Sequence, residues 1–127
     1  MNGVIYVALG GALGASARYG LSNAALRVNG TGFPMGTLAA NVIGSFAMGL
    51  LAGWLAAKVN GAENMRLFFG VGLLGGFTTF SAFSLEAMLL LEKKAYGAFA
   101  GYVGASVILS LLALAAGLLL ARRVFAL

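Results

Sequence analysis

The sequence contains neither cysteine nor histidine. The absence of cysteine excludes disulfides and thiol chemistry, and the absence of both residues excludes the common zinc sites and the serine–histidine–aspartate triad. Because no nucleophile is accompanied by an activating base, an enzyme is the class that the composition favours least.

Charged residues are scarce: they make up 9% of the 127 residues, whereas 61% are hydrophobic and the mean hydropathy is +1.00. A soluble domain carries about 25% charged residues, so this chain cannot cover a surface that faces water. We expect an all-α membrane protein that is surrounded by the lipid bilayer. The net charge of +5 comes from basic residues at the ends of apolar segments, which is typical of membrane anchors and argues against a nucleic-acid partner.

Four apolar segments reach or approach the roughly 20 residues that cross a bilayer as a helix. They span about residues 3–21, 36–57, 67–91 and 95–121. The single proline, Pro34, suits the start of the second helix, where its missing N–H costs nothing. Because the connecting segments are short, we expect residues 1–127 to form a single transmembrane domain.

Basic residues are balanced between the two ends of these spans. With the N-terminus inside, the inner set is Lys58, Arg66, Arg122 and Arg123, and the outer set is Arg18, Arg27, Lys93 and Lys94. The positive-inside rule sets orientation by an asymmetry, and four against four provides none. Two copies that insert in opposite directions can then pair as an antiparallel, dual-topology homodimer. A fixed topology with a balance that arose by chance remains the alternative.

The segment GGFTTFSAFSLE, residues 75–86, lies inside the third span. Its two glycines and two threonines lower helix propensity, so we expect a break in this helix. A break at bilayer depth frees backbone groups that protein, water or an ion must satisfy, and transporters coordinate cations with such carbonyls. The alternative is a continuous helix whose glycines pack against a neighbouring helix.

Aromatic and hydroxyl side chains alternate along the same segment. Phe80 and Phe83 share a helix face, and Ser81 and Ser84 lie beside them. The edge of an aromatic ring is positive and a hydroxyl can donate a hydrogen bond, so this surface suits a small anion. In the alternative reading, the rings face lipid and the serines bond their own helix.

Three other spans carry matching polar groups. Asn41 lies within the second span, where its amide must be bonded and serves either an ion or a neighbouring helix. Tyr102, Ser106 and Ser110 recur at four-residue spacing on the fourth span. Arg18, near the end of the first span, either snorkels to the interface or lines a vestibule that attracts anions.

Residues 75–86 resemble the signature of the Fluc/CrcB family of bacterial fluoride channels, which reads GG-x-TTFS-x-FS-x-E. The segments GGALGASARY (residues 10–19) and PMGTLAANVIGSF (residues 34–46) are similar to two further segments of that family. The resemblance covers essentially the whole chain in length, number of spans and order of motifs.

This resemblance implies a fluoride-selective, passive anion channel of the bacterial inner membrane, which exports cytoplasmic fluoride and lowers its toxicity. It implies an antiparallel homodimer with two fluoride pathways and a broken third helix. It also implies a sodium ion at the dimer centre that is structural and not transported. Backbone carbonyls of Gly75 and Thr78 of both subunits would hold this ion.

The resemblance also assigns residues to the fluoride pathway and to its entrance. Its pathway residues are Phe80, Phe83, Asn41, Ser81, Ser84, Ser110 and Tyr102, and Arg18 matches the family's vestibule arginine. Two positions depart from the family pattern, since Ala82 replaces a frequent threonine and Leu114 replaces a hydroxyl that some relatives carry. Both departures reduce the number of hydroxyl groups along the predicted pathway.

The rival function is a small, dual-topology, proton-coupled exporter of cationic compounds. Such an exporter needs an acid within the membrane, usually in the first helix, whereas the first span here has Arg18 and no acid. Glu86 is the only acid within a span, which is thin support for a cation or proton carrier. A non-conducting assembly factor, a second rival, has no need of hydroxyls beside Phe80 and Phe83.

Overall fold

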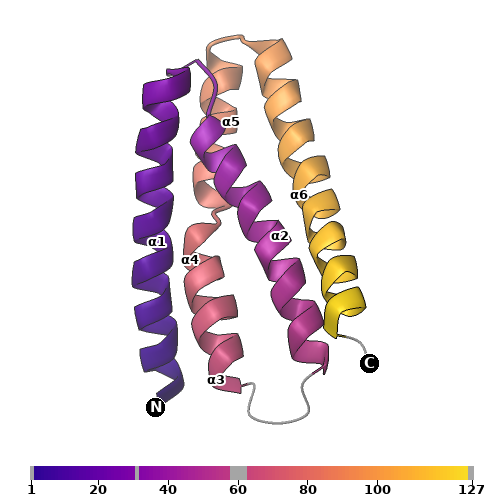
Figure 1. Cartoon of the computed structure of the whole chain (residues 1–127). Helices are drawn as coiled ribbons and strands as arrows, with labels where there is room; N and C mark the ends of the chain where they lie inside the picture. The colour runs from indigo at the N-terminus through magenta and orange to yellow at the C-terminus, as the bar shows by residue number, and fades with distance from the viewer. Residues whose placement is uncertain (1, 31, 58–62, 126–127) are drawn as a thin grey trace.

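The computed structural model describes residues 2–30, 32–57 and 63–125, and within these ranges the chain is built from helices (Figure 1). Three long helices are α1 (Asn2–Asn29), α2 (Met35–Ala57) and α6 (Tyr96–Phe125). The third apolar segment contains four pieces, namely α3 (Glu63–Met65), η1 (Arg66–Leu74), α4 (Gly75–Phe77) and α5 (Ser81–Glu92). The start of α1 and the end of α6 lie at the same end of the bundle.

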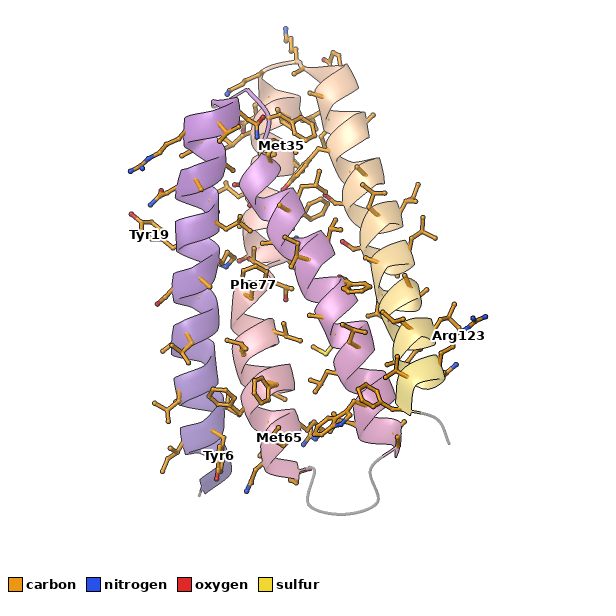
Figure 2. All side chains as sticks on the ribbon, in the orientation of Figure 1. Tyr6, Tyr19, Met35, Met65, Phe77 and Arg123 are labelled. Atoms are coloured by element: carbon orange, nitrogen blue, oxygen red, sulfur yellow. The ribbon has the colours of Figure 1, made fainter. Side chains whose placement is uncertain are left out.

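Four stretches are long and apolar enough to cross a membrane: Gly3–Asn29, Met35–Ala57, Glu63–Glu92 and Tyr96–Phe125. The prediction of four long apolar helices is therefore confirmed, as expected of a multi-pass membrane protein. Helix α1 continues to Asn29, beyond the expected end of the first span near residue 21. Large apolar side chains cover the outside, and Tyr19 and Arg123 point away from the bundle (Figure 2).

The chain leaves both α1 and α5 through a residue with a positive φ. Gly30 follows α1 with a φ of +74°, a left-handed conformation that glycine adopts without strain. Between α5 and α6, Lys94 has a φ of 61° and donates its N–H to the Leu91 carbonyl at 3.0 Å. The Ala95 N–H donates to the Leu90 carbonyl at 3.0 Å, so the last carbonyls of α5 are satisfied by the turn.

Helices α2 and α6 make the most extensive contact in the described chain, and glycines bring their backbones together. A Cβ on Gly49 would overlap the Leu114 carbonyl oxygen and lie 2.8 Å from the Leu118 nitrogen. A Cβ on Gly117 would lie 3.0 Å from the Leu50 nitrogen. This close approach holds the polar faces of α2 and α6 side by side.

The third span packs against α1 in the same way. A Cβ on Gly10 would lie 2.8 Å from the Leu73 nitrogen, and a Cβ on Gly76 would lie 2.7 Å from the Gly11 carbonyl oxygen. Gly14 likewise faces Leu73 without room for a side chain. Glycines on both partners therefore place the backbone of η1 and α4 directly against α1.

The third span is irregular along much of its length. Helix η1 is π-helical, and the Gly75 N–H still donates to the Gly70 carbonyl, five residues earlier. Residues 78–80, the linking segment, lie outside both α4 and α5. Such departures from regular helix occur frequently at functional sites. The third span is therefore the candidate location for a functional site.

Substitution of Gly49 by alanine tests the close contact between α2 and α6. Overpacking should lower the free energy of unfolding by about 1–3 kcal/mol, because the added Cβ has no room beside the Leu114 carbonyl. Thermal denaturation in detergent measures the effect. Gly20→Ala is the matched control, since no neighbouring helix lies within 4 Å of its Cβ position. Equal melting temperatures for the two variants would contradict the contact.

Candidate functional site

The linking segment begins with an extended residue. Thr78 has φ −89° and ψ 159°, which takes the chain out of the helical conformation. Both its N–H and its Oγ1 donate to the Leu74 carbonyl, each at 3.0 Å. The Oγ1 of Thr79 accepts from the Ala82 N–H at 3.2 Å and so caps the start of α5.

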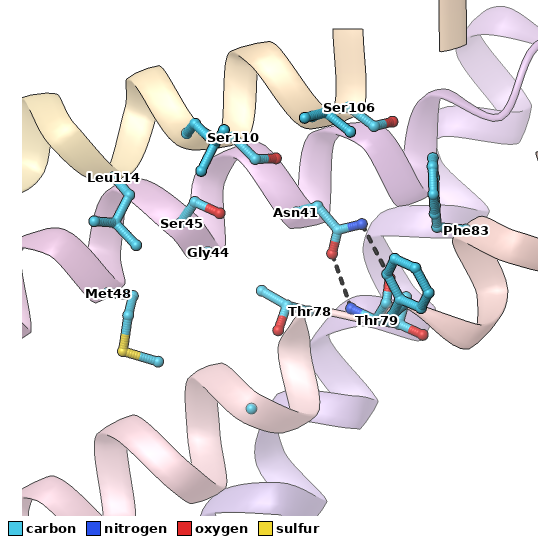
Figure 3. Close-up of a pocket in the computed structure, with 14 residues that line it drawn as sticks. Asn41, Gly44, Ser45, Met48, Thr78, Thr79, Phe83, Ser106, Ser110 and Leu114 are labelled. Carbon is cyan, nitrogen blue, oxygen red and sulfur yellow. Dashed lines mark hydrogen bonds between the residues drawn. The ribbon is translucent and has the colours of Figure 1, made fainter. Parts of the chain in front are cut away.

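Asn41 of α2 holds the linking segment from the other side. Its Nδ2 donates to the Thr79 carbonyl at 3.0 Å, and its Oδ1 accepts from the Thr79 N–H at 2.8 Å (Figure 3). The side chain thus replaces two backbone partners that a continuous helix would provide. Since a primary amide has two N–H donors, one of them remains available to another acceptor.

A pocket of about 530 Å³ lies between α2, α6 and the linking segment. Figure 3 shows side chains from all three elements around it. Its lining consists of Asn41, Gly44, Ser45, Met48, Gly75, Thr78, Thr79, Phe80, Phe83, Ser106, Val107, Ser110, Leu111 and Leu114. Amide, hydroxyl and phenyl groups therefore line the same pocket. No side chain in this lining carries a formal charge.

Two hydroxyls in this central pocket have no partner. The Oγ atoms of Ser106 and Ser110, four residues apart on α6, are buried and make no hydrogen bond in the described structure. Serine in a helix commonly bonds a carbonyl of its own helix, and neither of these two does so. A buried polar group without a partner is costly, so the fold of the single chain leaves the hydrogen-bonding capacity of both hydroxyls unused.

The two phenylalanines border the same pocket. The centroids of Phe80 and Phe83 are 5.5 Å apart with a tilt of 47° between the rings. Phe80 is 78% exposed in the single chain, whereas Phe83 packs against Tyr102 with a centroid distance of 5.2 Å. Phe83 is therefore held in place by the bundle, and Phe80 projects from it.

The remaining predicted pathway residues lie outside the lining of this pocket. The Tyr102 ring is fully buried, and its hydroxyl donates to Glu86 Oε1 at 3.0 Å. The Ser81 hydroxyl lies 3.4 Å from that of Thr79. Ser84 lies on the same helix as Ser81, and the structure places neither of them in the lining.

Three polar residues in the lining were absent from the predicted set, namely Ser106, Ser45 and Thr79. Ser106 shares the four-residue stripe of Tyr102 and Ser110, so its spacing was a usable signal. Thr79 lies four residues before Phe83 and Ser45 four before Gly49, so both had a helical spacing, but neither spacing pointed to this pocket. Their positions in the lining depend on where the linking segment meets α2.

Arg18 reaches the third span from α1. Its Nε donates to the Gly76 carbonyl at 3.3 Å, and the side chain is partly buried. This contact ties Gly76, two residues before the linking segment, to α1. The structure therefore gives Arg18 a backbone partner at the level of the pocket.

Two carbonyls next to this contact lose their regular helical donors. In a continuous helix the Gly75 carbonyl accepts from the Thr79 N–H and the Thr78 carbonyl from the Ala82 N–H, four residues later. Here the Thr79 N–H donates to Asn41 and the Ala82 N–H to the Thr79 hydroxyl. Main-chain carbonyl oxygens belong to the class of group that hard cations prefer.

Comparison with known proteins places this geometry in a family. Residues 5–118 match the family model described as "CrcB-like protein, Camphor Resistance (CrcB)". The chain belongs to this family. Its relatives include proteins from Phenylobacterium zucineum and Caulobacter vibrioides, with 58% and 54% identity, and each alignment covers 99% of this chain and 100% of the relative. A relative from Agrobacterium fabrum is 47% identical over 98% of this chain and 100% of its own length. All three are named "Fluoride-specific ion channel FluC".

Asn41→Ala tests the contact that holds the linking segment of this family member. Loss of two hydrogen bonds to Thr79 should lower the free energy of unfolding by about 3 kcal/mol and speed hydrogen exchange of the Thr79 amide. Thermal denaturation and exchange measured by mass spectrometry check both effects. Ser45→Ala, on the same helix and in the same pocket, is the control. If it is as damaging as Asn41→Ala, the bonds to Thr79 are not what stabilises this region.

Proposed function

We propose that the protein is a fluoride-selective channel through which the ion passes passively, so that cytoplasmic fluoride leaves the cell and its toxicity falls. The observation that carries this proposal is the pair of buried, unpartnered hydroxyls of Ser106 and Ser110 in the central pocket. The names of the relatives agree with it in substrate and in class of protein. The rival exporter of cations gains no support, since the pocket lining carries no acid.

The pocket chemistry suits a small anion that has left water. Hydroxyl O–H groups of Ser106 and Ser110 and the spare N–H of Asn41 can donate hydrogen bonds to it. The positive edges of Phe80 and Phe83 add weak attraction. Because each of these contacts is neutral, none binds the ion so tightly that it cannot leave, which conduction requires.

The pathway is complete only in a dimer. In the single chain the pocket is open, Phe80 is 78% exposed, and Gly75 and Val107 of its lining are also exposed. Polar groups cannot remain open to lipid without a large cost. A second, antiparallel copy covers this side and forms a second pathway, and the balance of four basic residues against four supports this arrangement.

Sodium has a structural place in this dimer. The carbonyls of Gly75 and Thr78, which have lost their regular helical donors, fit the ligand set expected for this ion. Both subunits would contribute these carbonyls at the dimer centre. When bound, the ion joins the subunits and is not transported. The assembled channel belongs in the bacterial inner membrane.

Anion efflux from liposomes tests the function directly. Vesicles that contain the purified protein are loaded with fluoride or with chloride, and valinomycin lets potassium carry the compensating charge. Rapid fluoride efflux without a proton requirement, and no chloride efflux, is the expected result. Fluoride efflux that depends on a proton gradient would identify a coupled exporter instead. The absence of efflux for both anions would contradict the proposal.

Ser110→Ala tests the hydroxyl that carries the proposal. Loss of one donor to a charged ligand should reduce fluoride efflux by about 10-fold, while the dimer remains intact on gel filtration. Ser16→Ala is the control, because this serine lies exposed on α1 away from the pocket. Equal efflux from the two variants would remove Ser110 from the pathway.

Phe80→Ile tests the aromatic border of the pathway. The isoleucine side chain keeps much of the apolar volume but has no ring edge, so fluoride efflux should fall with little change in dimer content. Tyr19→Ile, at an exposed aromatic residue of α1, should leave efflux unchanged. Wild-type efflux from Phe80→Ile would mean that the ring does not face the ion.

A further inference from the structure

Arg18 is a cation at the depth of the linking segment, and among the described residues it forms no ion pair. Of the three acids, Glu63 pairs with Arg66, Glu86 accepts from Tyr102, and Glu92 is exposed at the end of α5. Arg18 donates a hydrogen bond from Nε to the Gly76 carbonyl at 3.3 Å. Its partner is therefore the backbone of the third span.

That backbone needs to be held. Gly75 and Gly76 lack Cβ atoms, so their peptide groups can reorient at little steric cost. Side chains fix three carbonyls around this pair: that of Leu74 accepts from the Thr78 hydroxyl, that of Gly76 from Arg18, and that of Thr79 from Asn41. Arg18 supplies the one bond from α1 in this set.

The bond also separates two faces of α4. Gly76 packs against α1, where a Cβ on it would lie 2.7 Å from the Gly11 carbonyl oxygen and 3.2 Å from the Ala15 nitrogen. Gly75 is exposed on another side and lines the open pocket. Thr78, the extended residue that begins the linking segment, lines the same pocket. The bond from Arg18 to the Gly76 carbonyl therefore fixes the backbone next to Gly75, which borders the open side.

We propose that Arg18 is a positioning residue: by holding the Gly76 carbonyl against α1, it orients the carbonyls of Gly75 and Thr78 toward the partner subunit, where sodium binds. This inference rests on the dimer and the sodium site of the proposed function. It differs from the vestibule role implied by the family resemblance, in which Arg18 acts through its charge on the approaching anion. In the role proposed here, the charge alone does not suffice, because the planar guanidinium must donate from Nε.

Arg18→Lys separates the two roles. Lysine keeps the positive charge, but its ammonium is a point charge at the end of a flexible stem and does not reproduce the fixed guanidinium donor. The fraction of dimer in detergent is measured by gel filtration while N-methylglucamine replaces sodium at constant ionic strength. This readout does not depend on fluoride conduction.

The variant should need about 10-fold more sodium than the wild type for half-maximal dimer formation, and saturating sodium should restore the dimer by mass action. Arg27→Lys, an exposed arginine of the same helix, should behave as the wild type. Arg18→Gln, which removes the charge as well, should need at least as much sodium as Arg18→Lys.

Three results would overturn the proposal. A sodium dependence of Arg18→Lys equal to that of the wild type, with reduced fluoride efflux only in Arg18→Gln, would assign Arg18 to the vestibule by its charge. Failure of Arg18→Lys to dimerise at any sodium concentration would show a general folding defect, since a misplaced ligand is rescued by excess ion. A wild-type dimer that ignores sodium would remove the site itself, whereas fluoride efflux from wild-type liposomes reports separately on the channel function.

Discussion

Every backbone N–H and carbonyl at bilayer depth must find a partner, and the centre of this molecule is built around that constraint. Residues 78–80 lie outside the helices on either side of them. Asn41 supplies both a donor and an acceptor to Thr79, and Arg18 supplies a donor to Gly76. Helices α1 and α2 thus each contribute one polar side chain that binds the backbone of the third span between Gly76 and Thr79.

Glycine packing makes these contacts possible. Side-chain bonds of about 3 Å require the helices to lie at a fixed depth and rotation relative to one another. The approach of α1 to η1 and α4, at Gly10 and Gly76, brings Arg18 within reach of the third span. The approach of α2 to α6 at Gly49 sets Asn41 and Ser110 on either side of one pocket. The hydrogen bonds of the buried polar side chains therefore depend on the close packing of the helices in this bundle.

The long apolar runs were enough to predict the four helices, because the bilayer thickness fixes their length and nothing else in the chain competes with them. The poor helix propensity around Gly75 and Thr78 likewise predicted an irregular backbone in this segment. Sequence could not decide between a ligand and a structural role for Asn41, since both roles need the same amide. It could not foresee the bond from Arg18 to Gly76 either, because the acceptor is a main-chain atom whose identity depends on helix rotation.

The same reasoning explains why the polar side chains near the pocket are not equivalent. Asn41 has both amide atoms bonded to Thr79, so its loss disturbs the linking segment and the pocket together. Ser106 and Ser110 are buried without partners, and the regular helix α6 does not depend on their hydroxyls. The bonds between Asn41 and Thr79 belong to the architecture, whereas a polar group left unbonded at a cost of about 1–3 kcal/mol needs another reason to be there. In the proposed channel, that reason is a small anion with little water around it, in a pocket that contains amide, hydroxyl and phenyl groups but no formal charge.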